Sequence, residues 1–107
     1  MENGLAKQIQ LALEEAVVNI IDYAYPIGTD GHIDVCARSN GHRLKITISD
    51  SGVAFDPTEA GKVDTSLSAE DRPIGGLGIF LVSQIMDSVN YERVDGCNIL
   101  TLRKKYE

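Results

Sequence analysis

The sequence predicts an α/β (α+β) domain in which two helices cover a four-stranded, mostly antiparallel sheet. One segment has helical apolar periodicity, a second has a dense apolar run long enough for a buried helix, and four strand-like runs come as two hairpins. The predicted order is helix, hairpin, long polar segment, helix, hairpin, and such elements pack as two layers around one core. A chain of 107 residues suits one domain, so residues 1–107 are treated as a single unit.

The first helix is predicted from apolar residues that recur at helical spacing over about five turns. Pro26 and Gly28 follow the last of them and end the helix. The apolar stripe consists of Leu5, Ile9, Ala12, Leu13, Ala16, Val17, Ile20, Ile21 and Ala24.

Two hairpins are predicted from alternation and from turn residues. Residues 32–39 and 42–49 form the first hairpin around Asn40-Gly41, which is the strongest short hairpin signal. Residues 88–94 and 98–104 form the second, around Asp95-Gly96.

The segment between the first hairpin and the second helix is polar over residues 50–74 and has no sustained period. A connection of this length in a compact domain is usually a lid or a binding segment. A second helix, over about residues 77–87, follows a glycine-rich stretch. The long connection is therefore the expected location of a site.

Composition excludes several classes of protein. A net charge of −6 argues against non-specific nucleic-acid binding, and no apolar run approaches the ~20 residues of a membrane span. The start "MENGLAKQIQ" lacks the apolar core of a secretory signal. Cys36 and Cys97 share no metal-binding spacing and lie in strand-like runs, so we expect reduced core thiols in a cytoplasmic protein.

Three clusters carry polar or glycine residues that could act chemically. Glu15 and Asn19 lie one helical turn apart and could hold a metal-bound water or orient a nucleophile, although such residues at a stripe's edge are usually solvated. Asp50 ends a strand and could accept a hydrogen bond from an exocyclic amine, with Gly52 giving a flat ring access to the backbone, although Asp-Ser-Gly is also a routine turn.

The third cluster consists of Gly75, Gly76 and Gly78 at the start of the second helix. Bare backbone at a helix start suits phosphate, because the first amides of a helix are unpaired donors. A glycine turn that packs a helix closely is an equally good explanation. The spacing matches neither a P-loop nor a dinucleotide-binding fingerprint.

The three clusters in order, "EEAVVNIIDYAY", "DSGVAFDP" and "GGLGIFLV", resemble the motif set of the gyrase, histidine-kinase and stress-chaperone ATPase superfamily. Within it, the sequence is most similar to the anti-sigma factor serine/threonine kinases, or switch kinases. The resemblance covers the chain from about Leu13 to its end, including "NILTLRK". It implies a Bergerat-type ATP site between the helical layer and a lid over about residues 53–75.

The resemblance also implies a role for each site residue. Glu15 would be the general base, and Asn19 would supply an oxygen to Mg²⁺. Asp50 would accept from the adenine amino group, with Gly52 beside the ring. The implied phosphate and adenine contacts further along the chain are Gly75, Gly76, Leu77, Gly78 and Asn98.

The implied activity is Mg²⁺-dependent transfer of the ATP γ-phosphate to a serine or threonine of an antagonist protein, with a sigma factor as a further partner. Arg72 in the lid would pair with phosphate, although a solvated arginine is more common. Two alternatives stay open: a non-catalytic module that binds ATP and sequesters a sigma factor or adaptor, and an ATPase fragment of a larger regulator.

The sequence departs from the family pattern in several places. Ala54 replaces an expected glycine, and Asn98 stands where relatives often have threonine. No phosphoacceptor-histidine helix precedes the motifs, which argues against a complete sensor histidine kinase. Since the chain starts almost at the first motif, we expect either a trimmed fragment or a minimal family member without the usual N-terminal strand and helix, and the sheet edge exposed in this way would favour a homodimer.

Overall fold

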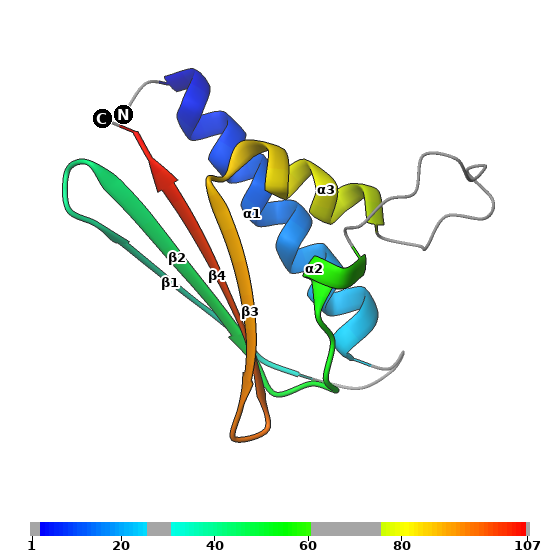
Figure 1. Ribbon diagram of the computed structural model, residues 1–107. Helices are drawn as coiled ribbons and strands as arrows, with labels where there is room; N and C mark the ends of the chain where they lie inside the picture. The colour runs from blue at the N-terminus through cyan, green and yellow to red at the C-terminus, as the bar shows by residue number, and fades with distance from the viewer. Residues whose placement is uncertain (1–2, 26–30, 61–75, 107) are drawn as a thin grey trace.

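The computed structural model describes residues 3–25, 31–60 and 76–106 (Figure 1). Within these ranges the elements follow the predicted order, with one additional short helix. They are α1 (Asn3–Ala24), β1 (Ile33–Ser39), β2 (Arg43–Asp50), α2 (Pro57–Ala60), α3 (Gly76–Ile85), β3 (Ser88–Val94) and β4 (Cys97–Lys105).

The four strands form one antiparallel sheet in the order β1-β2-β4-β3. Both hairpins therefore pair as predicted, and the two hairpins join through β2 and β4. Helices α1 and α3 pack against each other on one face of the sheet (Figure 1). The predicted two-layer α/β fold is confirmed.

The core lies between the two central strands and the two long helices. Alanines at three positions of α1 allow that helix to approach its neighbours closely, and branched side chains from β2 and β4 fill the space beneath. The buried apolar residues are Ile9, Ala12, Ala16, Ile20, Ala24, Ile46, Ile48, Val82, Met86, Leu100 and Leu102.

The turns explain the register of the hairpins. Asp95 and Gly96 both have positive φ (51° and 80°), which matches the right-handed twist of a two-residue hairpin. The first hairpin differs from the prediction, because β2 begins at Arg43 and not at residue 42. There the Asn40 side chain accepts hydrogen bonds from the backbone N–H groups of His42 and Arg43, which lengthens the turn by one residue.

Three expectations about packing and local structure were wrong. Ile21 was expected in the apolar stripe but is 52% exposed, because it lies on the side of α1 away from the sheet. Cys36 was expected in the core but is exposed, because β1 is an edge strand and this side chain shares the uncovered face with Arg38. The short helix α2 lies in a segment predicted to have no regular structure.

In the described ranges, no helix is both long enough and apolar enough to cross a membrane.

Candidate functional site

Three polar side chains are buried in the part of the chain that the structure describes: Asn19, Asp50 and Asn98, each 4% exposed. All three belong to the residues that the sequence singled out. Burying a polar group without a partner destabilises a fold, so each of these side chains needs a structural or a chemical reason.

Asp50 and Asn98 face each other at one end of the sheet. They are directly paired in the ladder between β2 and β4, and both side chains project toward the helical layer. The Asn98 amide donates to Asp50 Oδ1 at 2.9 Å, and the Gly52 N–H donates to the same oxygen at 2.9 Å. Asp50 Oδ2 is buried and has no hydrogen-bond partner among the described residues. One carboxylate oxygen is therefore held in place while the other is left as a free acceptor.

Asn98 also holds the segment that follows β2, residues 51–55, which we call the strap. Its amide nitrogen donates to the Val53 carbonyl at 2.8 Å, and its oxygen accepts from the Phe55 N–H at 3.2 Å and the Tyr91 hydroxyl at 2.6 Å. With the bond to Asp50, two donors and two acceptor positions of the side-chain amide are in use. The geometry gives Asn98 the role of orienting Asp50 and the strap.

Gly52 brings the strap against the C-terminal end of α1. A Cβ at this position would lie 2.3 Å from the Ala24 carbonyl oxygen, which is too close for any side chain. The next residue, Val53, donates its N–H to that same oxygen at 2.8 Å. The structure thus gives a reason for Gly52 that was not expected, namely its close approach to a helix end, and the access of a flat ring to Gly52 stays a prediction.

Two aromatic side chains add a further contact between α1 and the strap. The rings of Tyr23 and Phe55 stack with their centroids 5.2 Å apart and an interplanar angle of 27°. Desolvation raises the pKa of the Tyr23 hydroxyl above its ordinary value, and the nearby Asp22 charge adds to this shift. Aromatic packing of Phe55 against Tyr23 thus adds to the hydrogen bonds that hold the strap.

Glu15 and Asn19 lie on α1, upstream of its contact with the strap. The Asn19 Nδ2 donates to the Glu15 carbonyl oxygen at 2.8 Å, which orients the amide. Asn19 Oδ1 is buried and has no partner among the described residues. From Asn19 to Ala24 the helix rises by about 7.5 Å. A free acceptor on α1 therefore lies within about two turns of the strap.

The glycine-rich cluster falls partly within the described structure. Helix α3 begins at Gly76, so Gly76, Leu77 and Gly78 form its first turn, where backbone N–H groups lack intrahelical acceptors. Gly75 and Arg72 lie outside the described residues, as does most of the lid expected over residues 53–75. Residues 53–55, the first part of that expected lid, belong to the strap and are held by the contacts described above.

Two residues of this site were missed in the sequence, Tyr91 and Arg93. Arg93 donates to the Gly52 carbonyl at 2.8 Å, and Tyr91 donates to Asn98. In the register of β3 and β4, Arg93 is paired with Asn98. Tyr91 lies two residues away on the same face of the strand. The sequence did contain one signal for this part of the site, because Arg93 is a charged residue at a helix-facing position of a predicted strand.

The oxygen donors of this site suit a hard metal cation that takes most of its ligands from a bound molecule and few from the protein. No group of three or more His, Cys, Asp or Glu side chains suited to a metal occurs within the described ranges. Asn19 Oδ1 is nevertheless a buried carbonyl oxygen without a partner, the type of ligand that Mg²⁺ accepts. Mg²⁺ is usually bound by one or two protein oxygens together with substrate phosphates and water. The residues present therefore fit a magnesium ion that arrives with a phosphorylated ligand.

Fold and site together define an ATPase-type domain, with helices over an antiparallel sheet and buried acceptors on α1 and β2. The chain belongs to the histidine kinase-like ATPase domain family, whose model matches residues 1–104. This confirms the resemblance carried by the three motifs.

Comparison with curated proteins finds bacterial protein kinases. The chain is 34% identical over 94 residues to the serine/threonine-protein kinase BtrW of Bordetella bronchiseptica, covering 88% of this chain and 66% of that kinase. It is 32% identical over 98 residues to the serine-protein kinase RsbW of Listeria monocytogenes serovar 1/2a, covering 88% of this chain and 62% of the relative. The chain thus spans slightly less than two thirds of these relatives.

Solved structures show the same fold at lower identity. The catalytic domain of the histidine kinase ThkA superposes with a TM-score of 0.65 at 15% identity, over 92% of this chain and 65% of that chain. The Acinetobacter baumannii histidine kinase AdeS superposes with a TM-score of 0.64 at 15% identity, over 92% of this chain and 46% of that chain.

Proposed function

We propose that this chain is the ATP-binding catalytic domain of a bacterial protein serine/threonine kinase of the anti-sigma factor type. One observation carries the proposal. In the described structure, the two buried side-chain polar atoms without a hydrogen-bond partner are Asn19 Oδ1 and Asp50 Oδ2. Both belong to residues that the family motifs assign to ATP.

At the base end of the site, Asp50 Oδ2 accepts a hydrogen bond from the exocyclic amine of adenine. Asn98 and the Gly52 N–H hold the other carboxylate oxygen, so the free oxygen has a fixed direction. Asn98 acts by positioning Asp50 and the strap. Gly52 lets the strap pass close to α1, and this contact bounds the base pocket on its helical side.

At the phosphate end, Asn19 Oδ1 would hold the magnesium ion as its protein ligand. Bound Mg²⁺ would neutralise charge on the phosphates, which is most of what phosphoryl transfer requires besides positioning. The amides of Gly76, Leu77 and Gly78 at the start of α3, together with Gly75, donate to phosphate oxygens. Glu15 accepts the proton of the attacking serine or threonine hydroxyl.

The kinases named RsbW and BtrW support a protein substrate, and the partners that we propose are an anti-sigma antagonist and a sigma factor. The reaction takes place in the cytoplasm, where ATP is supplied. The competing function is a module that binds ATP and sequesters a partner without catalysis. Because the chain covers 66% and 62% of these relatives, a domain of a larger regulator is a further candidate.

Thermal unfolding with and without Mg-ATP tests nucleotide binding. At a hundred times Kd, binding to the native state adds about 2.7 kcal/mol to the free energy of unfolding. For a domain of this size that corresponds to a rise in Tm of roughly 10–20 °C. Omitting Mg²⁺ should remove most of the rise, and a Tm unchanged by Mg-ATP would refute the ATP site.

The Glu15→Ala variant separates a kinase from a binding module. We expect it to lose phosphate transfer to an antagonist protein while it keeps the Mg-ATP rise in Tm. Glu14→Ala is the matched control, because Glu14 is the neighbouring exposed carboxylate on α1 and accepts a hydrogen bond only from the Gln10 side chain among the described residues. Phosphate transfer by Glu15→Ala at the wild-type rate would contradict the role of Glu15, and a wild type that binds ATP without transfer would favour the sequestering module.

A further inference from the structure

A strongly basic surface lies at the end of the sheet remote from the candidate site. Six of the ten lysine and arginine residues of the chain line one cavity of about 570 Å³ there. We call this surface the basic end; its cationic residues are Arg38, Arg43, Lys45, Arg103, Lys104 and Lys105. Such a concentration of cations is unexpected in a chain with a net charge of −6.

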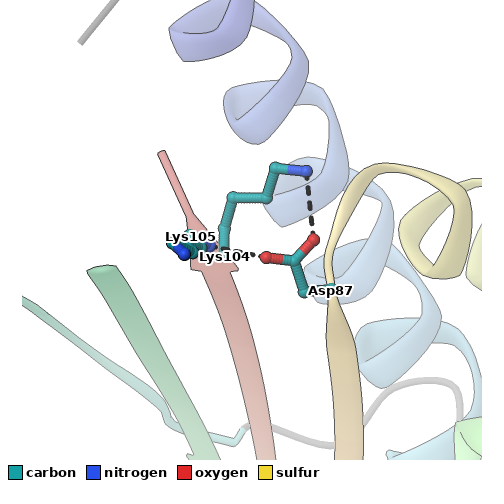
Figure 2. Close-up of polar contacts among 3 residues, drawn as sticks. All are labelled: Asp87, Lys104 and Lys105. Atoms are coloured by element: carbon teal, nitrogen blue, oxygen red, sulfur yellow. Dashed lines mark hydrogen bonds and ion pairs between the residues drawn. The ribbon is translucent and has the colours of Figure 1, made fainter. Parts of the chain in front are cut away.

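The single carboxylate among the described lining residues is already in use. Figure 2 shows Lys104 and Lys105 against the Asp87 carboxylate. The Lys104 ammonium lies 3.3 Å from Asp87 Oδ1, and the Lys105 N–H donates to Asp87 Oδ2 at 2.6 Å. Asp87 therefore neutralises one cation of the basic end and leaves the others.

Three of the remaining cations are directly opposite one another on neighbouring strands. Arg38 on β1 is paired with Lys45 on β2, and Lys45 is paired with Arg103 on β4. Lys45 and Arg103 alternate with buried residues of their strands, so the row lies on the sheet face away from the helices, and all three side chains are exposed.

Like charges placed directly opposite each other destabilise a sheet. Among the described residues, none of these three side chains forms an ion pair or a side-chain hydrogen bond. Folding alone therefore gives no reason for the row, whereas an anionic ligand would remove the repulsion.

The basic end does not belong to the ATP site. Asp50 and Asn98 are paired at the opposite end of the β2–β4 ladder from Arg43 and Lys105. The seven residue-to-residue steps from Arg43 to Asp50 correspond to about 23 Å along an extended strand. The Asp50 end of the candidate site is therefore well separated from the basic end.

The chemistry of the cavity suits carboxylates. Guanidinium groups bind carboxylate oxygens through two parallel hydrogen bonds, and two arginines of the row present this fork. Ser39, Asn40 and Ser88 add polar groups to the same lining. The rest of the chain is more acidic than the whole, and its field repels a long polyanion such as duplex DNA. A short acidic segment of a protein, by contrast, can contact the basic end alone and so avoids this repulsion.

We propose that the basic end binds an acidic segment of a protein partner through its exposed arginines and lysines. This surface is separate from the phosphate-transferring site, and its occupancy does not depend on ATP. A partner anchored there stays close to the domain after each encounter, which raises its effective concentration at the site.

The test measures the fluorescence anisotropy of a fluorescein-labelled peptide of ten glutamates at low salt, with a peptide of ten glutamines as the uncharged control. The matched variants are Lys45→Glu in the basic end and Lys7→Glu on the exposed surface of α1, which change the net charge equally. We expect Lys45→Glu to weaken binding of the glutamate peptide at least tenfold and Lys7→Glu to change it less than twofold. The Mg-ATP rise in Tm should be the same in both variants.

Several outcomes would overturn the proposal. Equal weakening by the two variants would mean that only net charge matters, and no binding of the glutamate peptide would mean that the surface does not recognise carboxylates. Tighter binding of a 20-bp DNA duplex than of the peptide would assign the surface to nucleic acid. A change in oligomeric state caused by Lys45→Glu, measured by analytical ultracentrifugation, would make it an interface between copies of the chain. By contrast, a wild type whose Tm does not respond to Mg-ATP would refute the ATP site alone, and peptide binding in that protein would still support the proposal for the basic end.

Discussion

Asn19 Oδ1 and Asp50 Oδ2 are each buried without a hydrogen-bond partner in the described structure. Leaving a buried acceptor unsatisfied costs about 1–3 kcal/mol, a large part of the stability of a small domain. A ligand that donates to one of these oxygens, or a cation that binds one, would remove this cost. At the scale of single residues, the proposed ligand would therefore stabilise the folded protein as it binds.

Asp50→Asn should reverse the preference of the site for the base. The asparagine oxygen can keep the two hydrogen bonds made to Oδ1, while its amide presents a donor where Oδ2 was an acceptor. A hydrogen bond to a charged group contributes about 1.5–3 kcal/mol, so ATP affinity should fall about 10- to 150-fold. Inosine triphosphate carries an oxygen in place of the adenine amine, so we expect it to bind wild type more weakly than ATP does but to bind Asp50→Asn at least as well as ATP does.

Calorimetric titration of wild type and Asp50→Asn with both nucleotides gives the four affinities. Unfolding of the nucleotide-free proteins is the control, and their Tm values should agree closely. The assignment of Asp50 would be wrong if the variant kept the wild-type ratio of ATP to inosine triphosphate affinity.

Asn19→Leu should give a nucleotide-free protein at least as stable as wild type, because the substitution removes an unsatisfied buried oxygen within an apolar helix face. The same variant should lose the Mg²⁺-dependent part of the ATP rise in Tm. Differential scanning calorimetry with ATP alone and with Mg-ATP separates the two effects. A full Mg²⁺ effect in Asn19→Leu would exclude this residue as a metal ligand.

At the scale of elements, the strap connects the sheet to the end of α1. Asn98 fixes it from the sheet, Arg93 from β3, and the Ala24 carbonyl from the helix. The last carbonyls of a helix lack intrahelical donors, and the Val53 N–H satisfies one of them. The strap, the end of α1 and the neighbouring parts of β3 and β4 therefore form one hydrogen-bonded unit.

Gly52→Ala should break this unit. The new Cβ would meet the backbone of Ala24 at 2.3 Å, and a backbone atom cannot move aside as a flexible side chain can. Overpacking of this kind costs about 1–3 kcal/mol, which lowers Tm by roughly 4–20 °C. Gly96→Asn is the control, since nothing lies within 4 Å of that position and asparagine tolerates its positive φ. Equal Tm values for the two variants would show that the contact with Ala24 is unimportant.

Asp87 joins the end of α3 to the end of β4, and this connection should depend on pH. The pKa of Asp87 is lowered from its ordinary value of 3.8, first by the hydrogen bond from the Lys105 N–H and then by that from the Lys104 side chain. Because the folded-state pKa is the lower one, the stabilisation is complete above the ordinary pKa and is lost as the pH falls through the lowered value.

Asp87→Asn should therefore unfold at a lower urea concentration than wild type near neutral pH, and the difference should shrink below about pH 4. Urea unfolding at a series of pH values measures it. A difference that stayed constant through the acid range would show that the charge of Asp87 contributes nothing.

At the scale of the whole molecule, local patterns predicted the order of elements and the fold. Periods of 3.6 and 2 residues are properties of short windows, so α1 and both hairpins were accessible from the sequence. The burial of Asn19, Asp50 and Asn98 was not accessible, because it depends on how α1 and α3 lie over β2 and β4. The contact between Gly52 and Ala24 joins residues that are distant in sequence, and only the assembled fold explains that glycine.

The exposure of Cys36 and Ile21 has a similar origin. A strand-like run cannot show whether its strand lies at the centre or the edge of the sheet, and an apolar stripe cannot show how much of its width a second layer will cover. The site residues were found through motifs, whereas Tyr91 and Arg93, which hold the site from the edge strand β3, belong to no motif.

The hydrogen bond between the strap and the end of α1 also limits where residues can be inserted into or deleted from that helix. Asn19 and Ala24 lie on the same helix, with the proposed magnesium ligand at one position and the contact that holds the strap at the other. One residue inserted between them would turn the two by about 100° and separate them by a further 1.5 Å, although the helix would still form. Insertions and deletions within these few residues should therefore be tolerated less well than most substitutions there.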